Sequence, residues 1–220
     1  MILYYYEHCP FCLRVRALAG LKNIALSLKL MAFADIETPI NLCGKKQAPI
    51  LQKDDGSIMI ESLDIMAYLD HFQGDILLKN YNCDPDLEAC LTHLSVLHLS
   101  LTSPLYVELK GTEFDNKSDQ DRYIKREESH MSISFSEALE KQERLKKDMQ
   151  IALQEKLVSI VETKHILNAQ DALFSRIVLF VFLRKLSLVK GLKLPYALEL
   201  FFKDFSKKTG LESMQDFLRP

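Results

Sequence analysis

Two cysteines three positions apart, in a Cys-Pro-Phe-Cys run at residues 9–12, stand where a short strand meets a helix. Residues 2–6 are apolar and aromatic, as in a strand, and residues 10–21 have helical periodicity. Proline suits the first helical position because its missing N–H would be unpaired there, which leaves Cys9 at the N-cap. The unpaired amides and the dipole of the helix favour a thiolate at that position. Because the thiolate is the nucleophile of disulfide exchange, the pattern predicts redox chemistry.

Cys12 lies one helical turn after Cys9, on the same face, and is well placed to attack a mixed disulfide formed on Cys9. Two other interpretations compete: a chance pair of packing cysteines, and half of a metal site. Zinc needs three or four clustered Cys or His ligands, and no second pair of cysteines occurs in the chain. We therefore predict a redox pair and no bound metal.

The cysteine count supports the same interpretation. Five cysteines are an odd number in a chain of 220 residues, and the N-terminus lacks the positive region and cleavage site of a signal peptide. We read the N-terminus as that of a mature protein, and we expect the reducing cytoplasm rather than a disulfide framework. Cys43, Cys83 and Cys90 show no paired spacing, and we interpret them as packing residues or bystanders.

Charge and hydropathy exclude two classes of partner. Lys and Arg number 28 against 30 Asp and Glu, which gives a net charge of -2 and no basic excess to attract nucleic acid. The most apolar run, residues 177–183, is bracketed by arginines and is far too short to cross a bilayer. We predict a buried core helix there, over residues 173–189, and no membrane partner.

The order of elements predicts two domains, an α/β domain followed by an all-α domain. Residues 1–72 read as β-α-β-α-β-β-α, and residues 73–85 hold Gly, Asn, Asp and Pro with little periodicity, which is typical of a linker. Residues 86–220 read as almost entirely helical. The expected C-terminal elements are helices over residues 87–101, 173–189 and 196–208, and a long amphipathic helix or helix pair over 135–161. A charged, solvated loop with short helical pieces is expected over 112–128.

Within the α/β domain, a strand is expected near residues 25–30, with alternating leucines, and a hairpin with strands over 49–53 and 57–60. Thr38 is the predicted N-cap of a short helix, and Ser62 that of the helix ending near residue 72. Taken alone, Glu61 and Ser62 read as simple helix capping. Pro49 reads as a trans proline that opens an edge strand.

His8 precedes the first cysteine, and two roles are open for it. As a cation it would favour a thiolate on Cys9, and as a neutral side chain it would be an ordinary residue before the cap. Tyr6 and Phe11 are aromatic neighbours that could wall the thiol in, although core packing suits Tyr6 better.

Three motifs together resemble those of thioredoxin-fold glutathione proteins. They are the Cys-Pro-Phe-Cys run at 9–12, Gln-Ala-Pro-Ile-Leu at 47–51 and Glu-Ser-Leu-Asp-Ile at 61–65. More narrowly, the chain resembles the glutaredoxin 2 family, the large two-domain bacterial glutaredoxins built like glutathione S-transferases. The similarity is dense to about residue 75 and continues in patches through residues 179–195. It implies a thioredoxin-like N-terminal domain and a helical C-terminal domain.

The resemblance also implies a glutathione site. Pro49 would be a cis proline facing Cys9, and the Ala48 backbone would pair with the cysteinyl part of glutathione. Glu61 and Ser62 would hold its γ-glutamyl end. Pro10 and Phe11 complete the implied set of glutathione-binding residues. Phe11 and Ala48 depart from the tyrosine and valine that are common in the family, both small changes to the walls of the site.

The predicted function is that of a glutathione-dependent thiol–disulfide oxidoreductase. The Cys9 thiolate would attack a protein disulfide or a glutathionylated cysteine, and Cys12 would resolve the mixed disulfide. Glutathione would be the reducing co-substrate, with no tightly bound cofactor. Two alternatives stay open: a glutathione S-transferase or dehydroascorbate reductase, and a non-enzymatic redox-sensing binding module. The resemblance favours a monomer, since the apolar spacing over residues 135–161 is not a sustained heptad.

Overall fold

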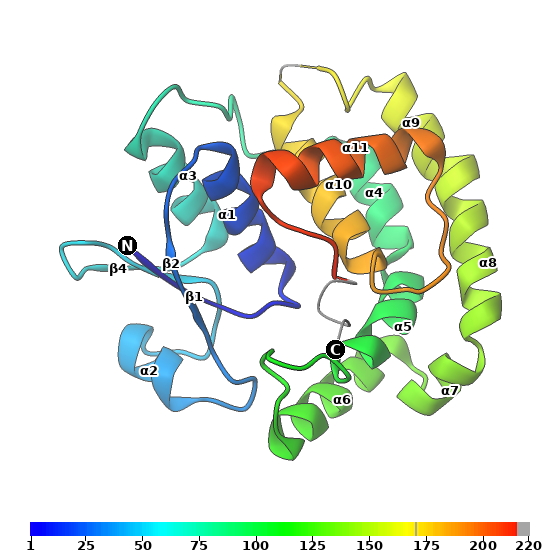
Figure 1. Ribbon diagram of the computed structural model, residues 1–220, viewed down its shortest axis with the longest axis horizontal. Coiled ribbons are helices and arrows are strands. Elements are labelled where there is room, and N and C mark those ends of the chain that lie inside the picture. Colours follow the sequence, from blue (N-terminus) through cyan, green and yellow to red (C-terminus); the bar gives the residue numbers. More distant parts are fainter. Residues whose placement is uncertain (170, 215–220) are drawn as a thin grey trace.

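The computed structural model describes residues 1–169 and 171–214, and it has an α/β part followed by a helical part (Figure 1). The predicted order of the first part is confirmed. Its elements are β1 (Ile2–Tyr5), α1 (Pro10–Leu21), β2 (Ser27–Leu30), α2 (Glu37–Cys43), β3 (Ile50–Gln52), β4 (Ile58–Met59) and α3 (Ser62–Phe72). The predicted extent of the last domain reaches residues 215–220, which lie outside the described residues.

The four strands form one mixed sheet in the order β2-β1-β3-β4. Strand β1 runs parallel to β2 and antiparallel to β3, so that Leu3 stands opposite both Leu28 and Leu51, and β3 forms the predicted hairpin with β4. The alternation expected near residues 25–30 does not produce a buried face. Leu28 and Leu30 are 45% and 37% exposed, because β2 is an edge strand with a neighbour on one side only.

Helix α1 joins the two parts of the molecule. It packs against α3 on one side and against α10 (Leu173–Leu186) and α11 (Tyr196–Thr209) on the other. At Gly20 the backbone of α1 comes so close to the carbonyl of Thr209 that any side chain would collide with it. A single hydrophobic cluster runs from the α/β part into the helices, and its buried members include Leu13, Leu69 and Leu179. The cysteine-bearing helix is therefore held by both parts.

The helical part differs from the prediction in three places. The helix expected over 87–101 is two helices that meet at Leu94, and the helix or helix pair expected over 135–161 is a run of four segments. The loop expected over residues 112–128 is wrong, because most of it forms a helix. The elements between the linker and α10 are α4 (Pro85–His93), α5 (Ser95–Tyr106), α6 (Lys117–Met131), α7 (Phe135–Glu140), α8 (Gln142–Ala152), the π-helix η1 (Leu153–Leu157) and α9 (Val158–Thr163).

Two predicted N-caps are also wrong. Helix α2 begins at Glu37, and the carboxylate of Asp35, rather than the Thr38 hydroxyl, accepts a hydrogen bond from the Thr38 N–H at 3.0 Å. Helix α3 begins at Ser62, so Glu61 occupies the N-cap position and makes no side-chain cap bond. Glu61 has φ 67°, a left-handed conformation that non-glycine residues adopt at a cost of about 1–3 kcal/mol and that clusters at ligand sites.

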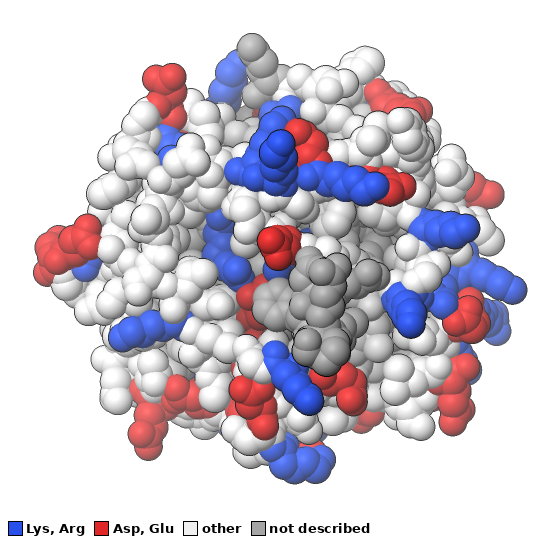
Figure 2. All heavy atoms as spheres, viewed as in Figure 1, with Lys and Arg blue, Asp and Glu red and all other residues white. Residues whose placement is uncertain are grey.

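The surface agrees with the charge count. Acidic and basic side chains are interspersed over the face in Figure 2, and neither sign dominates it. In the part of the chain that the structure describes, no helix is long and apolar enough to cross a membrane. The apolar run 177–183 instead forms the interior of α10, as predicted.

Candidate active site

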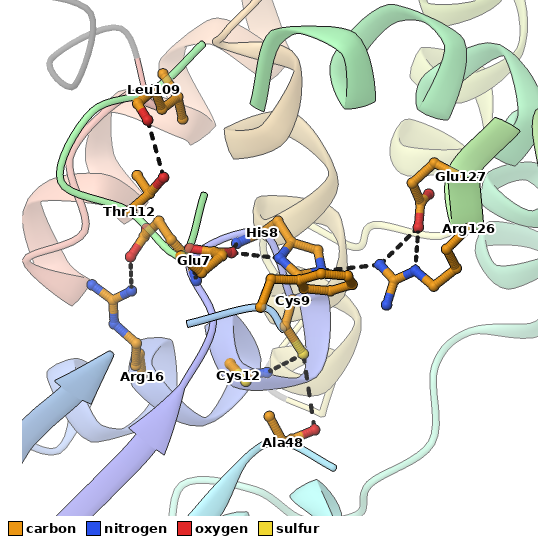
Figure 3. Close-up of polar contacts among 12 residues, drawn as sticks. Glu7, His8, Cys9, Cys12, Arg16, Ala48, Leu109, Thr112, Arg126 and Glu127 are labelled. Carbon is orange, nitrogen blue, oxygen red and sulfur yellow. Dashed lines mark hydrogen bonds and ion pairs between the residues drawn. The ribbon is translucent and has the colours of Figure 1, made fainter. Parts of the chain in front are cut away.

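Cys9 is the N-cap residue of α1, as the sequence predicts, and Pro10 begins the helix. The Cys9 sulfur accepts a hydrogen bond from the Cys12 backbone N–H at 3.4 Å, and its thiol faces the Ala48 carbonyl at 4.0 Å (Figure 3). Both cysteines are free thiols. Cys9 is 8% exposed as a residue, whereas Cys12 has no exposed surface. The local geometry thus places one reachable sulfur at the helix start and a second directly beneath it.

The two thiols have opposite pKa shifts. A hydrogen bond from the Cys12 thiol, together with the backbone N–H groups of Cys12 and Phe11, lowers the pKa of Cys9 despite burial. Burial, and then the bond to Cys9, raises the pKa of Cys12 well above the ordinary value. The pKa values of the two thiols are pushed apart, so Cys9 is the thiol of the pair that ionises first and Cys12 the one that keeps its proton.

Cys9 opens into a cavity of about 640 Å³ between the two parts of the chain. The α/β part contributes Pro10, Phe11 and Ala48 to its lining, and the helical part contributes side chains of α5, α6 and α10. Phe11 is 49% exposed at the rim. Four of the predicted site residues are therefore brought together around one cavity. Its lining from the helical part is Leu99, Arg122, Tyr123, Arg126, Glu127, His130 and Lys185.

The other predicted glutathione residues, Pro49, Glu61 and Ser62, do not line this cavity. The Ala48–Pro49 peptide bond is cis, as the resemblance implies and contrary to the trans form expected from the residues alone. Pro49 itself is buried. Ser62 is half-buried at the start of α3, and Glu61 is exposed and pairs with Lys45 at 3.3 Å.

His8 is neither a free cation nor an ordinary residue before the cap. Its Nδ1–H donates to the carboxylate of Glu113, and its Nε2 accepts from Arg126 at 3.1 Å (Figure 3). Burial lowers the pKa of His8, which keeps the ring neutral and consistent with this tautomer. Glu113 also accepts from the backbone N–H groups of Glu7 and His8, at 3.1 and 2.9 Å. One buried carboxylate from the helical part therefore fixes the segment that leads into Cys9.

A second buried contact ties the same segment to α10. The Glu7 carboxylate lies 2.5 Å from the Arg16 guanidinium and 2.8 Å from that of Arg184, and all three side chains are largely buried. Glu7 and His8 thus point away from each other, Glu7 toward Arg16 and His8 toward Arg126 (Figure 3). Such buried pairs hold one arrangement of the chain, because a broken pair leaves an uncompensated charge.

Models of two protein families match the chain. Residues 3–75 match the N-terminal domain of glutathione S-transferases, and residues 86–217 match the C-terminal domain of glutaredoxin 2. Glutaredoxin 2 of Escherichia coli (strain K12) is 33% identical over 213 residues, which cover 96% of this chain and 96% of that protein. This chain belongs to the glutaredoxin 2 family.

Solved structures agree with the glutaredoxin 2 assignment. Glutaredoxin 2 from Salmonella typhimurium, solved in complex with glutathione, is 30% identical, and the match covers 98% of this chain and 97% of that one with a TM-score of 0.86. The glutathione transferase GSTFuA2 from Phanerochaete chrysosporium is 11% identical with a TM-score of 0.61 over 94% of this chain and 97% of that one, which shows a shared fold only.

Family membership confirms the predicted fold class and the predicted function, a glutathione-dependent thiol–disulfide oxidoreductase. The transferase and binding-module alternatives are not favoured. The roles of individual residues remain predictions. Among the described residues no three Cys, His, Asp or Glu side chains gather as metal ligands would, and the absence of a metal also stays a prediction.

The residues that the helical part brings to the glutaredoxin site were not predicted from the sequence. The segments that carry them were predicted as a solvated loop or a buried core helix; these residues are Glu113, Tyr123, Arg126 and Lys185. A capping signal could have found the helix that carries Tyr123 and Arg126, but not Glu113, which lies before it. Asn116 accepts from the N–H of the residue three positions on, and the buried positions of α6 follow at helical spacing: Asp119, Tyr123, Glu127 and Met131.

Proposed function

We propose that Cys9 is the nucleophile of this glutaredoxin and Cys12 its resolving thiol. The observation that carries the proposal is the placement of the Cys9 sulfur at the N-cap, 3.4 Å from the Cys12 N–H, with its pKa lowered while that of Cys12 is raised. A thiolate is the reactive form in disulfide exchange, and the neighbouring Cys12 thiol stays protonated until it attacks the mixed disulfide on Cys9.

The reaction begins when the Cys9 thiolate attacks a disulfide of a substrate protein. A bond forms between Cys9 and one substrate sulfur, and the other leaves as a thiolate that takes up a proton. Cys12 loses its proton and attacks Cys9, which releases the second substrate thiol and leaves a Cys9–Cys12 disulfide. One glutathione thiolate then attacks Cys9 and frees Cys12. A second attacks the bound glutathione, so that two glutathiones become glutathione disulfide and the two cysteines are reduced again.

We propose that glutathione lies across Ala48 and the start of α3. The Ala48 carbonyl near the Cys9 sulfur suits pairing with the cysteinyl backbone of the tripeptide. The N-terminus of α3, an 11-residue helix that begins at Ser62, presents unpaired N–H groups to a carboxylate. The Glu61 carboxylate suits an ammonium group, and its exposed pair with Lys45 is weak enough to yield to one. Pro10, Phe11 and the cis Pro49 would shape the wall around the two sulfurs.

The proposed partners are oxidised or glutathionylated proteins, which a monomer reaches through the open cavity beside Cys9. We propose the cytoplasm as the location, since glutathione is kept reduced there and all five cysteines are free thiols. The mixed surface charge supports the expectation that nucleic acid is not a partner. We also propose domain boundaries at residues 1–72 and 86–220, joined by a linker over 73–85.

Substitution of Cys12 tests the assigned roles. In Cys12→Ser, reduction of a protein disulfide is expected to fall at least about tenfold, because the mixed disulfide on Cys9 has no internal thiol to resolve it. Turnover of a small glutathione mixed disulfide should persist, since glutathione resolves that intermediate directly. Both activities are followed through NADPH oxidation coupled to glutathione reductase. Cys90→Ser, at a buried cysteine of α4 that lines a separate cavity beside α9, is the matched control and should leave both unchanged.

One outcome would overturn the assignment. If Cys12→Ser reduces protein disulfides as fast as the wild type and rapidly conjugates glutathione to 1-chloro-2,4-dinitrobenzene, the site works as a transferase and not as a dithiol.

A further inference from the structure

Lys185, on the C-terminal half of α10, has an ammonium group for which the described residues provide no ion pair. Its side chain is buried, with the residue 7% exposed. Its ammonium group makes no hydrogen bond and no ion pair with any residue that the structure describes, and lies 5.6 Å from the centre of the Tyr106 ring. An isolated ammonium in a protein interior is costly unless some other charge compensates it.

The position of Lys185 indicates which negative charge compensates its ammonium group. Lys185 lines the cavity into which Cys9 opens, and it also lines a neighbouring cavity of about 630 Å³ that reaches Pro10. It therefore lies between the two cavities, at the turn that carries the sulfur. Only one lining residue of the first cavity, Glu127, is a carboxylate, and Arg126 already holds it at 2.7 Å.

Among the negative groups around Lys185, the carboxylates of Glu127 and Glu113 already accept hydrogen bonds from other side chains, and the Cys9 sulfur is the third. From the loop before α6, Glu113 is engaged by His8, which is neutral. From α5, burial lowers the pKa of His98 to about 3, and burial raises the pKa of Tyr106 well above its ordinary value, so both are uncharged at neutral pH. From α6, burial keeps the Tyr123 phenol protonated by raising its pKa, and Arg126 adds a like charge.

We propose that Lys185 is a positioning residue that holds Cys9 as a thiolate, so that the helical domain supplies part of the reactivity of a sulfur carried by the other domain. The proposal rests on the proposed function, in which Cys9 is the nucleophile. It adds to the helix amides a second source of positive potential from α10. The mutual effect agrees: Lys185 adds to the hydrogen bonds that lower the pKa of Cys9, and Cys9, after Glu127, acts to raise the burial-lowered pKa of Lys185.

The same charge has a redox consequence. When Cys9 enters a disulfide its negative charge is lost, and the ammonium of Lys185 is left uncompensated. A group that stabilises the thiolate therefore stabilises the reduced enzyme over the Cys9–Cys12 disulfide. Loss of the charge should make the dithiol easier to oxidise by glutathione disulfide.

The test is the pH profile of Cys9 alkylation by iodoacetamide, read by peptide mass spectrometry so that the other cysteines do not interfere. Lys185→Met is expected to move the midpoint for Cys9 up by roughly one pH unit, the size of effect an opposite charge has at close range. Lys185→Arg, which keeps the charge, should stay close to the wild type. Lys190→Met makes the same change in charge at an exposed position just beyond α10 and should have no effect. Lys185→Gln replaces the methionine variant if that one does not fold.

Each other outcome overturns the proposal. An unchanged midpoint in folded Lys185→Met, or equal shifts in the methionine and arginine variants, would make Lys185 a packing residue only. A raised KM for the glutathione mixed disulfide with an unchanged pH profile would make it a substrate ligand instead. If the wild-type midpoint itself is that of an ordinary thiol, the proposed role of Cys9 fails as well. A low wild-type midpoint that Lys185→Met leaves in place defeats only the role of Lys185.

Discussion

Replacing Cys9 with serine is expected to abolish turnover of a glutathione mixed disulfide, with a loss of at least about a thousandfold. A serine hydroxyl is not ionised at neutral pH and forms no disulfide, so neither half of the exchange can occur. The other contacts of the site are kept, since serine is also a good N-cap residue. The measurement is NADPH oxidation coupled to glutathione reductase, with circular dichroism to show that the variant is folded.

The matched control for Cys9→Ser is Cys43→Ser, which removes a half-buried thiol that donates to the Pro39 carbonyl on α2. That variant should keep essentially full activity. Activity in Cys9→Ser within tenfold of the wild type would take Cys9 out of the mechanism.

The second large effect concerns the contact between the two domains. Glu113→Ala is expected to lower the free energy of unfolding by about 3 kcal/mol, because the Glu7 and His8 N–H groups and the His8 ring all lose their acceptor in a buried site. For a chain of this size that corresponds to a fall of about 6–12 °C in the midpoint of thermal unfolding. Circular dichroism at 222 nm measures it.

Acid should mimic the loss of Glu113. Hydrogen bonds from His8 lower the pKa of Glu113 below its ordinary value of 4.5, although burial opposes this. The stabilisation is therefore fully present at neutral pH and is lost as the pH falls below 4.5 through the folded-state pKa. The Glu113→Ala variant should lack this part of the acid sensitivity. Glu108→Ala, an exposed carboxylate in the same connection, is the control and should change stability by less than about 0.5 kcal/mol. A Glu113→Ala variant as stable as Glu108→Ala would contradict this account of the interface.

The first domain could be predicted because its signals are local. A strand, an N-cap cysteine and a first-turn proline are adjacent in the chain, and the alternation before and after the turn at residues 54–56 fixes the hairpin. The two N-cap predictions were wrong although Thr38 and Ser62 are both good N-cap residues. In α2 the Asp35 carboxylate accepts the hydrogen bond in place of the Thr38 hydroxyl. The fold places Ser62 inside α3, after Glu61 at φ 67°.

The helical side of the site could not be predicted, because its residues carry no local sign of their role. Glu113 lies in a charged stretch whose composition is typical of a solvated loop, and only its long-range contact with His8 gives it a function. Lys185 follows an arginine at the end of an apolar run, where cations are expected at a helix C-terminus. That one of them faces the Cys9 cavity depends on how α10 packs against α1.

The central claim, that Cys9 is ionised at neutral pH by the start of α1, is tested most directly by the rate at which iodoacetamide labels Cys9 in the wild-type chain between pH 4 and 10. The account predicts a midpoint clearly below the value of about 8.5 for a free cysteine, with Cys12 unlabelled throughout the neutral range. A midpoint at or above 8.5, or labelling of Cys12 before Cys9, would contradict it.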